Sequence, residues 1–453
     1  MSIQIFVEAK ITPRQDFLRA TAPEESLGRH IYLSLLGEII PRALLDRLGL
    51  SHMLLGASTG SGFLLLLAEE NKAAAIDFLT KTAAGLAELS AHELDLSWSI
   101  TENLGDWSIV RKRLFEEMQR NVGTRATATS FEPYQDDQSA DASYFTELAK
   151  AATGATQVSV SLDNPARFQF GAGERTYTLG YQGDAVPWIA HLDLSNLKRR
   201  RAAALKLAVD SLDIRLRRAQ SVEDHLRLVH LYKNFFAGEL QTLLLRLPDA
   251  AGKIAIVDSG MEGFTVYGEL ELLLKVALEM HRVFETMAEV ALRDDAGVEG
   301  KSLSCALVPG REVEAVAAVS EALRLAQATS RDAFFAFGRV LDWEQVPDAM
   351  EIRNLCLRMV SQHGANSQFV ADLSAFFRES PYQSLRRKTG RFEKPWRLYR
   401  RMSIALETER QTKDSEKTKR RLLAEFIGKN AGQARLRPAG RVGLELARVT
   451  LDA

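Results

Sequence analysis

Hydrophobic positions in the N-terminal quarter of the chain follow two different periods. Short apolar runs of strand type alternate with longer stretches in which apolar residues recur at helical spacing. The pattern predicts a strand at 3–7, a helix at 27–48, strands at 53–57 and 63–67, a helix at 71–89 and a strand at 94–101. The Ser- and Gly-rich segment 58–62 joins the two middle strands as a hairpin turn. This βαββαβ order is typical of a ferredoxin-like domain.

The same order of elements returns in the middle of the chain. It comprises a strand at 188–192, helical patterns at 197–219 and 221–247, hairpin strands at 254–257 and 264–267, a helix up to 291 and a strand at 303–308. Two such units in one chain indicate an internal duplication. A polar linker at 123–141 and small strands at 157–161 and 176–181 predict an insert between the units.

The chain after Trp343 is predicted to be helical. Stretches at 349–362, 367–378, 395–410 and 415–427 have the apolar spacing of helices with one buried face, and the basic tail 429–453 has weaker signals. The predicted fold class is therefore α+β, with two ferredoxin-like domains and a helical C-terminal domain. The expected boundaries are 1–125 for the first domain, 126–185 for the linker and small insert, 186–345 for the second domain and 346–453 for the helical domain.

Composition narrows the class of protein further. With 453 residues, 46% hydrophobic and 26% charged, the chain has room for several packed cores, and collagen-like, mucin-like or wholly disordered proteins are excluded. The longest apolar run, 63–68, is too short to cross a membrane, and 1–10 lacks the features of a signal peptide, so we expect a cytoplasmic protein. Two cysteines, Cys305 and Cys356, exclude a disulfide framework, and the scattered histidines predict no metal site.

Charge is distributed unevenly, although the formal net charge is only −1. Residues 378–453 contain 20 Lys and Arg against 9 Asp and Glu. Lys and Arg side chains that neutralise phosphates release counterions whatever the nucleotide sequence, so this region is a candidate for contact with a polyanion. The alternative is a solvated basic helical face.

Two basic clusters are candidates for RNA or partner contact. The first consists of Lys198, Arg199, Arg200 and Arg201, and its alternative role is a solvated helix start. The second is interleaved with Trp396 and Tyr399, which either stack on unpaired bases or pack inside the helical domain. The cations of the second cluster are Arg386, Arg387, Lys388, Arg391, Lys394, Arg397, Arg400 and Arg401.

The second ferredoxin-like unit carries candidate chemistry. A palm-type nucleotidyl transferase needs acidic residues at the end of its first strand and in its hairpin turn, because two divalent ions must clamp the triphosphate and activate the attacking hydroxyl. Glycines in the turn let phosphates approach the backbone. Here Asp193 ends the predicted first strand, and Ser195 follows two residues later. The hairpin turn consists of Gly260, Met261, Glu262 and Gly263.

These segments, in this order, resemble the large signature subunit of type III CRISPR effector complexes, the palm-domain protein of the Csm and Cmr systems. Residues 11–18 resemble the family's SGIQDF-type segment, 58–63 its SGGGHF-type hairpin, 193–196 its DVDN-type strand end and 258–264 its SGGDD motif, while 302–308 and 339–343 resemble the segments that follow. The resemblance covers most of the chain. It implies two palm domains and a helical domain similar to the small subunit of the complex.

Missing family features decide the expected activity. The GGDD pattern is replaced by the sequence Gly-Met-Glu-Gly at 260–263, and Ser195 stands where an acidic residue is expected. Asp193 and Glu262 suffice for one metal ion, whereas two-ion catalysis needs more ligands. The site is therefore predicted to be vestigial, without catalytic residues, metal or cofactor, and ATP and Mg²⁺ are expected only if it still functions. The chain also has no HD dipeptide, and 123–182 has no cysteine for the family's zinc site.

The resemblance implies a non-catalytic, structural large subunit of a type III CRISPR ribonucleoprotein that helps to hold guide RNA and target RNA in antiviral defence. The expected partners are these RNAs and the capping and backbone subunits, with a small subunit as a further candidate and no membrane. Two alternatives stay open. One is residual, target-RNA-activated synthesis of cyclic oligoadenylates from ATP, supported by Asp193 and Glu262. The other is ATP as a silent structural ligand.

Overall fold

The computed structural model describes residues 4–13, 17–18, 22–59, 62–128, 140–152, 155, 157–178, 201–247, 250, 252–379, 400, 403–404, 406, 412–427 and 438–451. The chain divides into two compact units. The N-terminal unit comprises Met1–Leu197, Ala202–Leu303 and Arg311–Ser320. The C-terminal unit comprises Lys198–Arg201, Ser304–Gly310 and Glu321–Ala453.

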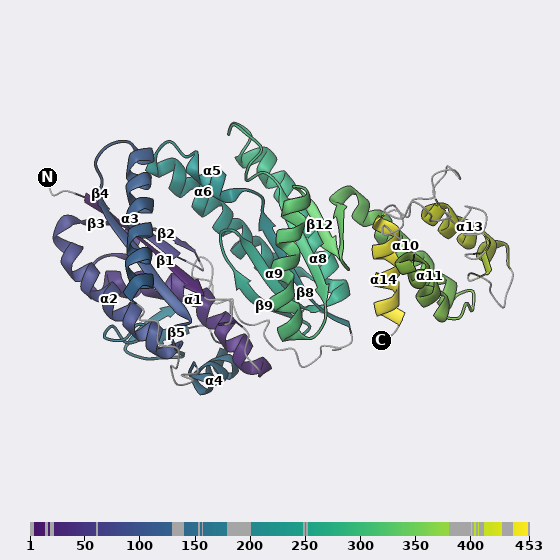
Figure 1. Cartoon of the computed structure of the whole chain (residues 1–453), viewed down its shortest axis with the longest axis horizontal. Coiled ribbons are helices and arrows are strands. Elements are labelled where there is room, and N and C mark those ends of the chain that lie inside the picture. The colour runs from purple at the N-terminus through teal and green to yellow at the C-terminus, as the bar shows by residue number, and fades with distance from the viewer. Residues whose placement is uncertain are drawn as a thin grey trace. The chain divides into compact units, whose positions relative to one another are not determined.

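The first palm is a ferredoxin-like fold in the N-terminal unit. Its elements are β1 (Gln4–Pro13), α1 (Pro23–Arg47), η1 (His52–Leu54), β2 (Leu55–Thr59), β3 (Gly62–Ala68), η2 (Glu69–Asn71), α2 (Lys72–Leu89) and β4 (Leu94–Glu102). The strands form an antiparallel sheet in the order β2-β3-β1-β4. The helix α3 (Trp107–Ala128) follows, and α2 and α3 both lie along β4 (Figure 1). The predicted βαββαβ order is confirmed.

A helix and a small sheet follow the first palm. The helix α4 (Ala142–Ala152) packs on α1, and β5 (Gln157–Val160) lies between β6 (Phe168–Phe170) and β7 (Arg175–Thr178). Phe145 and Val158 belong to the same buried core as α1, and the Tyr144 hydroxyl donates to the Phe168 carbonyl oxygen at 2.8 Å. The described part of the insert is therefore held by packing on the first palm.

The second palm repeats the strand order of the first. Its strands are β8 (Ala202–Val209), β9 (Ile254–Ser259), β10 (Gly263–Glu269) and β11 (Leu303–Pro309), and β12 (Ala333–Ala336) and β13 (Arg339–Asp342) extend the sheet. The order is β9-β10-β8-β11-β12-β13. The helical elements are α5 (Leu212–Arg217), α6 (Val222–Asn234), the π-helical η4 (Phe235–Glu239), α7 (Leu240–Arg246), α8 (Leu270–Ala291), α9 (Glu312–Thr329) and η5 (Trp343–Gln345). The predicted duplication of the ferredoxin-like fold is thus present.

The first strand of the second palm lies where the sequence predicts a helix. The helical pattern at 197–219 is wrong because it contains β8, and the predicted strand at 188–192 lies outside the described residues. Side chains of β8 are buried at successive positions, as in a central strand that is covered on both faces. A continuous, alanine-rich apolar run of this kind fits a helical period as well as a strand.

Helices make up the C-terminal unit after η5. They are α10 (Val346–Ser361), α11 (Gln368–Glu379), α13 (Lys413–Ile427) and α14 (Pro438–Leu451). Their shared core includes Leu355, Phe369, Leu422 and Leu444. The predicted helices at 349–362, 367–378 and 415–427 are confirmed, whereas most of 395–410 lies outside the described residues. The sequence prediction missed α14, because the Gly- and Ala-rich tail gives a weak pattern.

Both cysteines, Cys305 and Cys356, are buried free thiols. Burial raises the pKa of Cys356 to about 12, so this thiol stays protonated and unreactive. No helix within the described ranges combines the length and the apolar character needed to cross a bilayer.

Candidate functional site

The hairpins of the two palms share a residue pattern and the strand pairing that goes with it. Residues 58–63 and 259–264 both have the pattern Ser-x-x-x-Gly-Phe, and in each hairpin the serine pairs with the phenylalanine. Gly62 begins β3 and Gly263 begins β10. A Cβ atom at these glycines would lie 2.5 Å and 1.9 Å, respectively, from a carbonyl oxygen of the first strand. Each glycine is therefore required because the third strand presses on the backbone of the first.

The turn of the second hairpin lies against the end of β8. The Val209 N–H donates to the Glu262 carbonyl oxygen at 2.9 Å, and the Gly260 N–H donates to the Gly263 carbonyl oxygen at 2.9 Å. The Glu262 side chain is exposed, whereas Met261 is buried in the hairpin. The main chain of the turn is thus fixed, and Glu262 extends into solvent beside the strand end.

The acidic residue at the end of β8 is Asp210. Its carboxylate Oδ2 accepts a hydrogen bond from the Ser302 hydroxyl at 2.8 Å, and its N–H donates to the Ser302 carbonyl oxygen at 3.0 Å. The Asp210 carbonyl oxygen accepts from the Gly300 N–H at 2.9 Å. Ser211, the next residue, has a φ of 56° and begins the turn into α5. Asp210 is buried, with 3% of its surface exposed.

The sequence prediction assigned the strand-end position to Asp193. Asp193 and Ser195 lie outside the described residues, and the strand that pairs with β10 is β8. The signal that would have found Asp210 is the apolar run 202–209 that precedes it, interpreted as a buried central strand. In the structure, the acidic residue at the end of the first strand is therefore Asp210, which follows Val209, the residue whose N–H donates to the Glu262 carbonyl oxygen.

These two carboxylates are a sparse donor set for metal-dependent chemistry. Asp210 is buried and already accepts from Ser302, while Glu262 is exposed. Over the described ranges of the chain, no three or more His, Cys, Asp or Glu side chains gather to hold a metal ion. Two-ion phosphoryl transfer needs oxygen ligands that clamp both ions. The described residues at the hairpin do not supply such a set.

A polar row crosses the sheet just below the second hairpin. Lys206 of β8 pairs with Thr265 of β10, and Thr265 pairs with Asp258 of β9. The Lys206 ammonium group donates to the Ser320 hydroxyl of α9 at 3.2 Å. The Thr265 hydroxyl is buried and has no hydrogen-bond partner among the described residues.

His30 of α1, in the first palm, interacts electrostatically with this row. Burial lowers the pKa of His30 to about 4; the negative charge of Asp258 opposes this shift, and the positive charge of Lys206 adds to it. His30 is therefore neutral near pH 7. His30 of the first palm thus lies near the row of the second palm, an arrangement that follows from the contact of α1 with β9.

The palms also meet where α6 of the second palm contacts β2 of the first palm. This is the counterpart of the contact between α1 and β9. The Lys233 ammonium group of α6 donates to the Glu38 carboxylate of α1 and to the Ser58 hydroxyl of β2. Ser58 donates to Glu38 at 2.8 Å, and Arg42 donates to the other Glu38 oxygen at 3.1 Å. Burial acts to raise the pKa of Glu38, but Lys233 and Arg42 outweigh it and lower that pKa.

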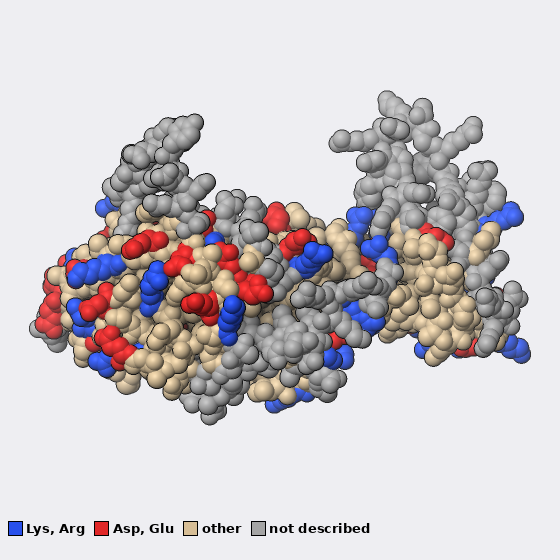
Figure 2. All heavy atoms as spheres, turned by 90° about the horizontal axis from the view of Figure 1, so that it is seen from below, with Lys and Arg blue, Asp and Glu red and all other residues tan. Residues whose placement is uncertain are grey.

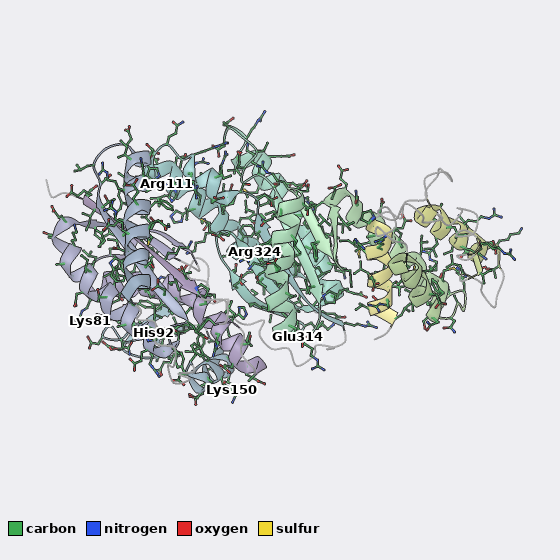
Figure 3. All side chains as sticks on the ribbon, in the orientation of Figure 1. Lys81, His92, Arg111, Lys150, Glu314 and Arg324 are labelled. Atoms are coloured by element: carbon green, nitrogen blue, oxygen red, sulfur yellow. The ribbon has the colours of Figure 1, made fainter. Side chains whose placement is uncertain are left out.

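Arg111 of α3, labelled in Figure 3, also joins the palms of the N-terminal unit. Its guanidinium group donates to the Leu216 carbonyl oxygen of α5. Beside it, the rings of Trp107 and His225 lie 5.3 Å apart between centroids. Burial lowers the pKa of His225 to about 4, and the positive charge of Arg111 adds to that effect. The interface thus contains polar, aromatic and charged contacts.

The described members of the predicted basic clusters have different environments. The Arg201 guanidinium group donates to the Thr450 carbonyl oxygen at 3.2 Å, near the end of α14, where the helix dipole favours a cation. Arg400 is exposed. The other members, Lys198, Arg199, Arg200, Arg386, Arg387, Lys388, Arg391, Lys394, Arg397 and Arg401, lie outside the described residues. Their contacts with RNA or partners stay predictions.

Comparison with known proteins gives a fold but no sequence relative. No protein-family model matches the chain, and no curated protein matches it. Its fold is similar to that of a chain in the Csm1-Csm4 subcomplex of the type III-A CRISPR-Csm interference complex, with 16% identity and a TM-score of 0.68, covering 99% of this chain and 70% of that chain.

The fold of this chain is similar in the same way to chains of Csm1-Csm4 cassettes with bound ligands. The cassette in complex with cA3 gives 16% identity and a TM-score of 0.67, covering 99% of this chain and 69% of that chain. The cassette in complex with one ATP gives 15% identity and a TM-score of 0.67, covering 99% and 70%. The predicted α+β architecture of two palms and a helical domain is therefore confirmed at the level of the fold.

Proposed function

We propose that this protein is the large palm-domain subunit of a type III CRISPR ribonucleoprotein and that its role there is structural. The observation that carries the proposal is the fold similarity to chains of Csm1-Csm4 assemblies, which extends over 99% of the chain. The proposed partners are a capping subunit comparable to Csm4, backbone subunits, a small subunit, guide RNA and target RNA. The proposed location is the cytoplasm.

The second hairpin supports the structural role. Its turn carries Glu262 as the acidic side chain, and the nearby Asp210 is buried against Ser302. Catalysis of phosphoryl transfer depends on charge that is fixed before the reaction, and the loss of such charge costs orders of magnitude in rate. We therefore assign RNA cleavage to the backbone subunits and no nucleotide polymerisation to this chain.

Affinity purification tests the proposal. The tagged chain is purified from cells that express its neighbouring genes and a repeat-spacer array, and the RNA and proteins that accompany it are identified. We expect discrete guide RNAs that share a repeat-derived 5′ end, together with capping and backbone subunits. A chain that is purified without RNA and without these subunits contradicts the proposal.

A second candidate function is residual synthesis of cyclic oligoadenylates from ATP. It is favoured by the two acidic residues near the strand end, Asp210 and Glu262, and by neighbours whose structures hold cA3 and ATP. The test incubates the purified complex with target RNA, Mg²⁺ or Mn²⁺ and labelled ATP, and compares it with the Glu262→Gln and Asp210→Asn variants. Product that disappears in both variants supports the enzyme. Absence of product, with ATP binding detected by calorimetry, leaves ATP as a structural ligand.

A further inference from the structure

The helix α13 is fixed to the C-terminal unit by one face. Thr418 and Leu422 are buried, and Leu422 belongs to the helical core. Arg421 forms an ion pair with Glu351 of α10. Near the start of α13, the Asp414 carboxylate lies 3.5 Å from the His363 imidazole, which precedes α11. The direction in which the opposite face of α13 points is therefore set by packing.

That opposite face is a basic crest, formed by Lys413, Lys417 and Arg420. With about 3.6 residues per turn, positions 413, 417 and 420 lie on one side of a helix, and the buried Thr418 and Leu422 lie on the other. All three side chains of the basic crest are exposed. Within the described part of the chain, none of them forms an ion pair or a side-chain hydrogen bond.

Some exposed cations elsewhere in the protein, unlike those of the basic crest, are paired with a carboxylate of their own helix. On α2, the Lys81 ammonium group pairs with Asp77 at 2.8 Å, and on α9 the Arg324 guanidinium group lies 3.5 Å from Glu321. On the face of the N-terminal unit that Figure 2 shows, basic and acidic side chains are intermixed. Although Asp414 and Glu416 occur in α13, neither pairs with the basic crest. Thus no carboxylate of the described residues lies within ion-pair distance of these three cations.

We propose that the basic crest contacts the phosphate backbone of RNA, an inference that rests on the proposed function and assigns one of its contact surfaces. Positions 413 and 420 are about 10 Å apart along the helix, so the three long side chains can reach successive phosphates. Such contacts need no apolar surface and are independent of base sequence. A protein interface, in contrast, buries an apolar centre and is depleted in lysine. The next residue on this side of the helix is Ala424, whose small side chain offers no apolar anchor for a protein partner.

The test measures how RNA binding depends on salt. The full chain is titrated with a fluorescein-labelled single-stranded RNA of mixed sequence at several salt concentrations, followed by anisotropy. The variant K413A/K417A/R420A is compared with the control K81A/K150A/R324A, whose exposed residues are labelled in Figure 3. Both variants remove two lysines and one arginine, so their net charge is identical.

We expect the crest variant to bind RNA at least tenfold more weakly at low salt. The slope of log K against log salt should fall by about 2, because each phosphate contact to a single strand contributes about 0.7. The control keeps the wild-type slope. The variant K413R/K417R/R420K, which keeps the three charges, should restore wild-type binding. Melting curves of all variants should coincide because the changed side chains are exposed.

Three outcomes overturn the inference. The first is an equal salt slope for the crest variant and the control. The second is a failure of the charge-preserving variant to restore binding. The third is the loss of a protein subunit from the purified complex of the crest variant while its RNA binding is unchanged. The last result identifies the crest as a surface for an acidic protein. If the wild-type complex carries guide RNA, the proposed function stands even when one of these three outcomes is observed. A crest-dependent RNA slope in a chain that brings no guide RNA from cells contradicts the proposed function but supports the crest as an RNA surface.

Discussion

His30 and His225 are held neutral inside the N-terminal unit. Burial is the largest cause in both cases and lowers each pKa to about 4. An imidazole in an unfolded chain titrates near 6.5. Unfolding therefore exposes two groups that take up protons in weak acid, and the free energy of unfolding becomes dependent on pH.

We expect the protein to lose stability as the pH falls from about 6.5 towards 4, because the unfolded state binds more protons than the folded state in this window. Above about pH 6.5 these two imidazoles are neutral in both states and contribute no pH dependence. The variant His30→Gln should reduce the stability difference between pH 7 and pH 4.5 by about 2 kcal/mol. Urea unfolding at the two pH values measures it. The companion variant is His225→Gln. If the stability difference between the two pH values is unchanged in His30→Gln, the assignment of His30 as a buried, neutral imidazole is contradicted.

The third strand of each palm begins with a glycine for a reason that the sequence does not reveal. In the sequence, Gly263 suggests a phosphate-binding turn. In the structure, the missing side chain allows β10 to approach the backbone of β8, and Gly62 plays the same part in the first palm. Glycine at this position is consequently expected whether or not a nucleotide binds.

The variant Gly263→Ala tests this role. Its Cβ would lie 1.9 Å from a β8 carbonyl oxygen, so β10 must move away, and we expect a loss of about 3 kcal/mol in the free energy of unfolding. Gly338→Ala is the matched control, since a Cβ there meets nothing within 4 Å and only its φ of 73° is unfavourable, which costs about 1 kcal/mol. Denaturant unfolding compares the two. Equal losses show that the close approach is not what requires Gly263.

Local patterns predicted most elements of the palms, and the failures have identifiable causes. The hairpins were predictable because strands and turn are adjacent in sequence and carry distinct residue types. The strand β8 was not, because burial on both faces removes the alternation that marks a strand. With β8 misplaced, Asp210 was overlooked as the strand-end carboxylate and Asp193 was assigned its position. The position of Glu262 next to Val209, and so near Asp210, depends on strand register, which the sequence alone does not specify.

Sequence patterns could not predict the contacts between the palms. Lys233 and Glu38 are separated by 195 positions, and nothing in their neighbouring residues indicates that they meet. The same holds for His30 and Asp258. These pairs arise because the duplicated folds pack through equivalent elements, α1 on β9 and α6 on β2. Residues that combine into a site across such an interface become recognisable only once the packing is known.

The ion pair between Lys233 and Glu38 should couple the two palms energetically. Both side chains are partly buried. Removal of Glu38 leaves the Lys233 ammonium group with reduced hydration and without its carboxylate partner, whereas removal of Lys233 leaves Glu38 with Arg42 as its remaining cation. We expect Glu38→Gln and Lys233→Met each to cost about 2 kcal/mol in urea unfolding, a value below that of fully buried pairs. The double variant should cost less than the sum, with a coupling energy of about 1 kcal/mol.

The exposed pair Asp77 and Lys81 of α2 supplies the control cycle, because both side chains are more than half exposed and solvent screens their attraction. Its coupling energy should be below about 0.5 kcal/mol. Additive effects of the Glu38 and Lys233 substitutions, matching the control, would mean that this ion pair does not contribute to the cohesion of the palms. A clear coupling energy in the first cycle and none in the second assigns part of the cohesion of the N-terminal unit to this single polar contact.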